Sequence, residues 1–449
     1  MKRIYFDSLL SRLPAGIKEH IYETGRDNLT VRVIRGSFWA LTGSMISKGF
    51  FLVSSIIVAR ILGRSIFGEL GIIQSTINMF AAFAGFGLGV TSTKYIAEFR
   101  DKDPDMAGNI IASSKILAVI IGIVFTAIFF IMAPWITGRM IGASDLADEM
   151  RLGSLMLFFF AVNGAQTGAI AGFENFKDIA KINISVGLFS FPVQIVLTYF
   201  LGLYGAIIGL GLTYLFQWIL NSIFLRRTAG KFNIQIRLKK SFKDLSYLWE
   251  FSTPAFLGGI IVSLVLWYAN TMLVSNVNGF NEMAVFNAAN QWQNIVLFIP
   301  MAVSQISLPL FSNSKDNLLK LRRLIKYNII LNLSICLVLA TSFALFSKII
   351  MNSYGSDFRE GHPVLVILVF TAVFISINSV IGQIIAGLGR MWTGFLINML
   401  WATVFLVLAS YFINHGSGAI GLAQSMLFSY LLHTILVAAV SVYFIKKRF

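Results

Sequence analysis

Long apolar runs separated by short polar segments follow one another along the chain from Phe38 to Ile445. Each run has about 20 residues, the length that an α-helix needs to cross a hydrocarbon core of about 30 Å. The pattern predicts about twelve transmembrane helices, at residues 36–62, 66–92, 109–133, 151–172, 179–202, 205–226, 249–275, 284–308, 327–350, 363–386, 393–414 and 419–445. No stretch alternates polar and apolar residues with the regularity of the strands of an outer-membrane barrel. The other structure that satisfies all backbone hydrogen bonds in lipid is the helix. We therefore expect an all-α fold, that of a polytopic membrane protein.

The two halves of the chain resemble each other. A shift of 215 residues places Asn163, Ala171 and Gly172 on Asn378, Ala386 and Gly387, and a shift of 213 places residues 204–207 on 417–420. We expect an N-terminal segment (1–35), a six-helix lobe (36–226), a basic cytoplasmic linker (227–248) and a second six-helix lobe (249–449). Because each lobe has an even number of helices, both lobes insert into the membrane with the same orientation. Parallel repeats of this kind usually flank a substrate path and rock against each other, which predicts a transporter.

Composition and charge agree with this topology. The chain is 57% hydrophobic and 12% charged, with a mean hydropathy of +0.77. Most of its 36 lysine and arginine residues fall in the segments that the twelve-helix topology places on one side of the membrane. The positive-inside rule assigns that side, with both termini, to the cytoplasm. The net charge of +16 is therefore a topology signal, and nucleic acid is not an expected partner.

The N-terminal segment leaves two alternatives open. No signal-peptide apolar region follows Lys2 and Arg3, so the first inserted element should be the helix near Phe38. Apolar residues between Ile4 and Ile21 suit an interfacial amphipathic helix interrupted by Pro14, or a loosely ordered tail, and neither is favoured.

Lys48 is the candidate for chemistry at membrane depth. It lies about twelve residues, or about 18 Å, into the first predicted helix, near the bilayer midplane. A charge there costs at least about 2.5 kcal/mol, so Lys48 should face a wet cavity or a counter-charge. The spacing of three serines places them on the same helical face, which predicts a cavity lining: Ser44, Ser47 and Ser55. Lys115 in the third helix is a second candidate cation, although snorkelling to the inner headgroups is the favoured interpretation.

The acidic residues fall outside the membrane midplane in this topology. An unpaired cation in a membrane cavity favours an anionic substrate, and phosphate is the obvious candidate for a lysine. Export of organic cations, or proton relay through a buried carboxyl group, has no evident residue here.

A polar stripe follows the eighth predicted helix. Its members occupy positions i, i+3, i+4 and i+7 and therefore one face: Asn287, Asn290, Gln291 and Asn294. Gln74 and Asn78 occupy the corresponding region of the second helix. Such amides bind sugar hydroxyls or hold helices together, and the sequence leaves both roles open.

Other patterns carry no chemistry. The run Gly85-Phe86-Gly87-Leu88-Gly89 follows no strand, so it is not a nucleotide loop. The four histidines are scattered, no catalytic triad can be argued at membrane depth, and no metal or cofactor is expected. The single cysteine, Cys336, lies in an apolar run and should be a packing residue.

The stretch 59–100 carries a family resemblance. It contains Ala59-Arg60-Ile61-Leu62-Gly63, Phe67-Gly68, the glycine run 85–89 and Lys94-Tyr95-Ile96-Ala97-Glu98. This stretch, and the layout of the whole chain, resemble the polysaccharide (Wzx-type) flippases of the MATE-like superfamily. Arg64 stands where the family usually has a proline, a departure that should matter little at an outer turn.

The resemblance implies a V-shaped pair of six-helix bundles around a cationic cavity. It implies a flippase that moves an undecaprenyl-diphosphate-linked oligosaccharide to the outer leaflet for cell-surface polysaccharide synthesis, such as that of O-antigen. The implied partners are this lipid-linked substrate and membrane lipids, with polysaccharide-assembly proteins as candidates.

Two alternatives belong to other functional classes. A cation-coupled exporter of drugs or other small molecules could share the fold, but such exporters usually carry a buried acid in the first helix, where this chain has Lys48. A membrane polysaccharide polymerase or ligase should carry a large outer loop, whereas the longest outer segment here is about 134–150. We therefore expect a transporter and not an enzyme.

Overall fold

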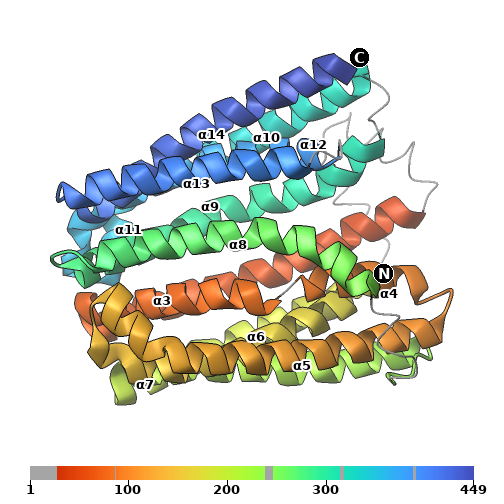
Figure 1. Cartoon of the computed structure of the whole chain (residues 1–449), viewed down its shortest axis with the longest axis horizontal. Helices are drawn as coiled ribbons and strands as arrows, with labels where there is room; N and C mark the ends of the chain where they lie inside the picture. The colour runs from red at the N-terminus through yellow and green to blue at the C-terminus, as the bar shows by residue number, and fades with distance from the viewer. Residues whose placement is uncertain (1–27, 86, 238–245, 314–317, 388–390, 449) are drawn as a thin grey trace.

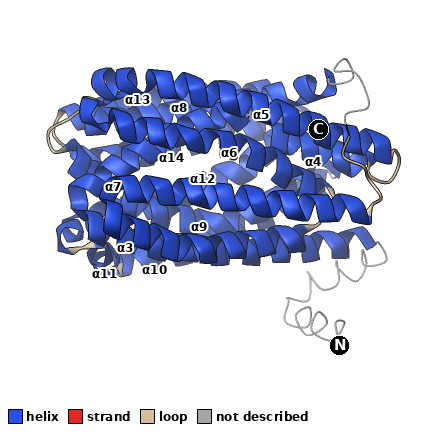
Figure 2. Ribbon diagram, turned by 90° about the horizontal axis from the view of Figure 1, so that it is seen from below, coloured by secondary structure: helices blue, strands red, loops and turns tan. Residues whose placement is uncertain are grey.

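The computed structural model describes residues 28–85, 87–237, 246–313, 318–387 and 391–448 (Figure 1). Within these residues the regular structure is helical and no strand occurs (Figure 2). The first half contains α3 (Asn28–Gly85), α4 (Leu88–Phe99), α5 (Pro104–Trp135), η1 (Ile136–Ile141), η2 (Ser144–Leu146), α6 (Ala147–Gly172) and α7 (Phe176–Lys231). The second contains α8 (Ser246–Val274), α9 (Gly279–Asn313), α10 (Leu318–Leu345), α11 (Ser347–Tyr354), η4 (Ser356–Gly361), α12 (His362–Gly387), α13 (Met391–Asn414) and α14 (Gly418–Arg448).

The long helices α3 and α7 each consist of two helices joined at one glycine. Gly63 has φ 76° and ψ 172°, and Gly202 has φ 57° and ψ −132°. Only glycine adopts such angles readily, because it lacks a Cβ. Each break reverses the chain with almost no loop, so that the predicted pairs of helices form tight hairpins.

The predicted all-α membrane fold is confirmed, and each of the twelve predicted segments falls on helical structure. Two of them are interrupted: 66–92 between α3 and α4, where Gly87 is left-handed, and 327–350 at Phe346, between α10 and α11. Among the described residues, eight stretches are long and apolar enough to cross a membrane, and two of these contain the glycine breaks. Several helix ends also differ from the prediction. The first helix begins at Asn28, and α7 continues to Lys231, inside the predicted linker. The N-terminal alternatives concern residues 4–21, which lie outside the described ranges.

The helices pack in two groups. In the first lobe α3 packs on α7 and α5 on α6, and in the second α12 packs on α9 and α14. Figure 1 shows the first lobe in the lower half of the view and α9–α14 in the upper half, with α10 and α14 rising away from the lower lobe toward the right.

The hydrophobic cores show where the lobes join. One continuous buried cluster includes Phe67 and Ile72 of α3, Phe129 of α5, and Tyr354 and Phe358 of the second lobe. At the other end of the described helices the cores are separate. One of them contains Ile96, Ile170 and Leu225 of the first lobe, and another contains Ile384 and Val380 of the second. Among the residues whose burial is described, the lobes therefore share a core at one end, and each buried cluster named at the other end belongs to one lobe.

Candidate functional site

The lobes are sealed together around the break in α3. We call this region the inter-lobe seal, meaning residues 55–76 of α3 with their partners on α8, α9, α11, η4 and α14. Phe67 packs on Tyr354 and Phe358, with ring centroids 6.2 and 6.0 Å away. Arg60 donates to the carbonyl oxygen of Ser353 at 2.6 Å. The seal therefore combines an aromatic core with polar contacts at its edge.

Arg64 makes the polar contacts that link the most elements. Its Nε donates to the Asn281 carbonyl at 3.0 Å and its Nη1 to the Asp357 carbonyl at 2.9 Å. Its Nη2 lies 3.4 Å from Oε1 of Glu282. The other oxygen of Glu282 accepts a hydrogen bond from the backbone N–H of Ala419 at 2.8 Å, at the start of α14. Arg64 thus joins α3 to three elements of the second lobe, a role that the sequence analysis missed when it treated this position as a minor departure.

Deeper in the seal, polar side chains of α8 and α9 bind α3. Gln291 donates to the Ser55 hydroxyl at 2.9 Å, and its oxygen accepts from the Tyr354 hydroxyl at 3.2 Å. Burial raises the pKa of Tyr354, which keeps this phenol a neutral donor. Asn270 donates to Ser75 at 2.8 Å. In this conformation, therefore, Gln291 holds helices together, one of the two roles that the sequence left open.

Lys48 lies two turns along α3 from Ser55, toward the end where the cores separate. The side chain is exposed, and Nζ is 5.6 Å from the centroid of the Phe298 ring on α9. A cation at this distance over an aromatic face gains about 0.5–1 kcal/mol at an exposed site. No carboxylate among the described residues lies within ion-pair distance of it. Lys48 therefore lies between the lobes with its charge available.

The serines that were expected to share the face of Lys48 separate from it. Ser44 accepts a hydrogen bond from Asn183 of α7 at 3.3 Å, and Ser47 is only 8% exposed. Ser47 packs on Gly187, whose missing side chain lets α7 approach α3 closely. In this conformation these two serines face their own lobe, Ser55 lies in the inter-lobe seal, and Lys48 alone of the four is exposed.

The remaining predicted residues occupy three environments. Asn287 packs beside Gly71 of α3, where a Cβ would lie 3.1 Å from its Nδ2, so it belongs to the seal. Asn78 and Asn294 are exposed, and Gln74 and Asn290 are half-buried. Lys115 is exposed in a separate pocket of the first lobe, lined by no residue of α3 or α9, so it does not join Lys48.

The architecture matches a known class of transporter. A solved structure described as the inward-facing conformation of a multidrug resistance MATE family transporter of the MOP superfamily superposes with a TM-score of 0.75 at 17% identity, covering 92% of this chain and 98% of that one. The chain therefore has the MATE-like fold.

The sequence comparisons define the family. The model of the family described as polysaccharide biosynthesis protein matches residues 33–315, and the chain belongs to this family. A putative O-antigen transporter of Shigella flexneri is 23% identical, with 88% of this chain and 94% of the relative covered. The lipopolysaccharide biosynthesis protein WzxC of Escherichia coli is also 23% identical, with 91% and 80% covered. The family resemblance seen in the sequence is thus confirmed.

Proposed function

We propose that the protein is a flippase that moves an undecaprenyl-diphosphate-linked oligosaccharide from the cytoplasmic to the outer leaflet of the inner membrane. The observation that carries the proposal is the exposed Lys48, between the lobes and without a carboxylate partner in the described structure. A charge at membrane depth is costly unless it meets water or an opposite charge. The diphosphate of the substrate supplies that opposite charge.

The direction of opening follows from the charge distribution. The positive-inside rule assigns both termini to the cytoplasm, and the inter-lobe seal then closes the outer face. We propose that this conformation is the inward-open state. Rocking of the two repeats, 36–226 and 249–449, would break the seal and expose the same centre to the other side.

The amide side chains supply candidate contacts for the sugars. Exposed Asn78 and Asn294, and half-buried Gln74 and Asn290, offer donors and acceptors without charge, as sugar hydroxyls require. Asn287, Gln291 and Ser55 become available to the substrate only when the seal opens. Transport of this kind makes and breaks no covalent bond, so the protein needs no enzymatic activity, and polysaccharide-assembly proteins are its candidate partners.

The test is complementation of a strain that lacks the gene, with the outer-leaflet lipid-linked oligosaccharide as the readout. Lys48→Ala should lower the amount exposed at least about tenfold, because it removes a charge-assisted contact to phosphate. Lys48→Arg should restore part of it, since the charge remains with altered geometry. Lys348→Ala, at an exposed lysine of α11, is the matched control and should behave as the wild type.

One result would contradict the role of Lys48, and another would contradict the flippase function itself. Full complementation by Lys48→Gln or Lys48→Met, at normal expression, would remove Lys48 from the substrate site. A deletion strain with normal surface polysaccharide and increased sensitivity to cationic dyes would replace the flippase with an exporter.

A further inference from the structure

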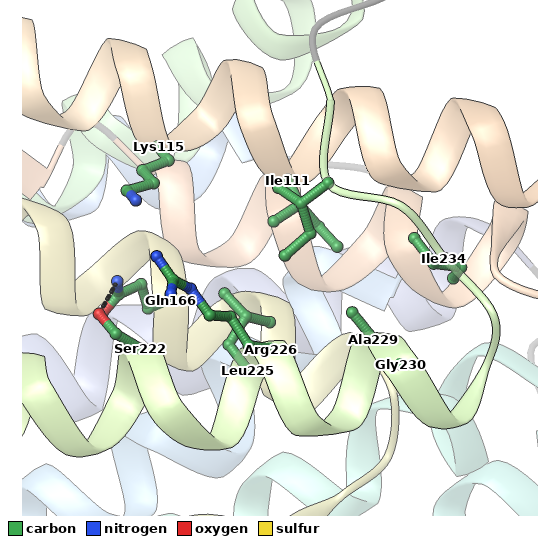
Figure 3. A pocket seen from close by; sticks show the side chains of 10 residues that line it. Ile111, Lys115, Gln166, Ser222, Leu225, Arg226, Ala229, Gly230 and Ile234 are labelled. Carbon is green, nitrogen blue, oxygen red and sulfur yellow. Dashed lines mark hydrogen bonds between the residues drawn. The ribbon is translucent and has the colours of Figure 1, made fainter.

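The first lobe contains a second cationic site, in a pocket separate from the inter-lobe centre. It has a volume of about 430 Å³ and lies between α5, α6, α7 and the segment that follows α7 (Figure 3). The lining residues are Ile111, Lys115, Gln166, Ser222, Leu225, Arg226, Ala229, Gly230, Ile234 and Ile236. Because α5 packs on α3, α4 and α6 of its own lobe, the pocket belongs to the first lobe alone.

Two cations face each other across this pocket. Figure 3 shows the ammonium group of Lys115 and the guanidinium group of Arg226 pointing toward one another. Neither forms an ion pair in the described part of the chain, and no lining residue is acidic. Like charges repel, and the repulsion grows where hydrocarbon replaces water. An anion between the two groups would remove this repulsion and gain two charge-assisted contacts.

The rest of the pocket combines a pair of polar side chains with an apolar wall. Gln166 is 3% exposed and donates to the Ser222 hydroxyl at 2.9 Å, beside the two cations. Ile111, Leu225 and Ile234 form much of the remaining surface. A free inorganic anion has no apolar surface to bury against such a wall. The lining therefore fits an amphipathic molecule with an anionic head and a hydrocarbon part.

The position of the pocket points to a lipid of the inner leaflet. Arg226 is five residues from the end of α7 at Lys231, and Lys115 is eleven residues from the start of α5 at Pro104. The positive-inside topology places both helix ends at the cytoplasmic surface. Basic pockets between helices on this side of a membrane bind the head groups of anionic lipids.

We propose that Lys115 and Arg226 bind the phosphate of a resident anionic glycerophospholipid, with its acyl chain against the apolar wall. The site goes beyond the proposed transport function, because its occupant stays in the inner leaflet and is not the transported molecule. Its occupancy tethers α5 to the end of α7.

The experiment is native mass spectrometry of the full chain titrated with phosphatidylglycerol or phosphatidylcholine in detergent. The wild type should bind the first phosphatidylglycerol more tightly than phosphatidylcholine, by about fivefold for each cation that contacts the head group. The variant Lys115→Ala/Arg226→Ala should lose this preference. The matched control Arg227→Ala changes the neighbouring exposed cation, which stacks on Phe224 outside the pocket, and should keep it.

A second variant separates binding from folding. Gly230→Trp leaves both charges in place and adds a large side chain to the pocket lining, so it should also abolish the preference. Gly230 is exposed and an added Cβ there meets nothing within 4 Å, so the melting temperature should stay within a few degrees of the wild type. Unchanged preference for phosphatidylglycerol in the double variant would overturn the proposal. Displacement of phosphatidylglycerol from the pocket by equimolar undecaprenyl diphosphate would also overturn it, by assigning the site to the transported lipid. None of these measurements depends on transport. Their outcome therefore tests the lipid site independently of the flippase proposal.

Discussion

Arg64 and Lys48 are both cations of α3, but the structure gives them different surroundings. Arg64 has two carbonyl oxygens and a carboxylate of the second lobe as partners. Within the described part of the chain, Lys48 has only the face of Phe298, whose centroid is 5.6 Å from its Nζ. A charge with all its partners in place holds a structure together, whereas a charge without them is available to a ligand.

Arg64→Ala should shift the protein toward the state in which the inter-lobe seal is open. The contacts of Arg64 are partly exposed, so their loss should cost about 1–2 kcal/mol, a change of about 5- to 30-fold in the population ratio. Spin labels at Asp145→Cys and Val277→Cys, on a Cys336→Ser background, would report the distance between the lobes at this end. Both sites are exposed.

The control for Arg64 is Arg151→Ala. Arg151 pairs with Asp148 at 2.9 Å inside the first lobe, so its removal should leave the distance distribution unchanged. Equal distance distributions for Arg64→Ala and the wild type would contradict this role of Arg64 and show that the aromatic part of the seal suffices to hold the lobes together.

For single residues, the sequence predicted the depth of a residue in the membrane better than the direction in which its side chain points. The depth of Lys48 followed from counting residues along an apolar run, and Cys336 is a fully buried packing residue as expected. The directions of Ser44 and Ser47 could not be read from spacing, because residues three and four apart cover a wide sector of a helix. Which part of that sector meets α7 depends on small residues such as Gly187, far away in the sequence.

Among the elements, the helices followed from the apolar pattern, but the breaks at Gly63 and Gly202 did not. The sequence predicted short loops at both places. A glycine inside an apolar run is compatible with a straight helix, so the angles that reverse the chain depend on tertiary packing.

Gly63→Ala should destabilise the protein by about 1–3 kcal/mol, since an L-residue is strained at φ 76° and ψ 172°. An added Cβ meets nothing within 4 Å there, so the cost comes from the backbone alone. Thermal unfolding in detergent, followed by intrinsic fluorescence, measures the effect.

Gly211→Ala is the matched control. Gly211 lies within the helical part of α7 and its Cβ would also meet nothing within 4 Å. This substitution should leave stability unchanged or raise it by up to about 1 kcal/mol, because alanine favours the helix. Equal effects of the two substitutions would contradict a strained turn at Gly63.

The whole molecule is organised by contacts between residues more than 190 positions apart, such as Ser55 with Gln291 and Thr76 with Trp267. The internal repeat predicted two lobes, but it could not show at which end they meet. That depends on side-chain complementarity between the lobes, which no periodicity within one lobe records.

Locking the inter-lobe seal should stop transport. In a Cys336→Ser background, Gly71→Cys and Asn287→Cys place two Cβ atoms 3.5 Å apart on facing helices, a distance that a disulfide can bridge. Oxidation should trap the conformation described here and abolish flipping, because alternating access requires the seal to open. Reduction should restore it, as measured by transport in proteoliposomes.

A cross-link within one lobe is the control for the locked seal. Gly122→Cys and Ala161→Cys place two Cβ atoms 3.4 Å apart on α5 and α6 of the first lobe. Their oxidation should leave transport intact. Undiminished transport by the oxidised inter-lobe pair, with the cross-link confirmed by mass, would contradict rocking about this seal.

The charge of Lys48, which has no carboxylate partner among the described residues, has an electrical consequence. A rocking lobe would carry this ammonium group through part of the membrane field, where a full elementary charge gains or loses about 2.3 kcal/mol per 100 mV. A potential that is negative inside then favours the inward-open carrier when it is empty. A bound diphosphate would offset the lysine charge and reverse the sign of the moving assembly. The same voltage would thus return the empty carrier inward and drive the loaded one outward.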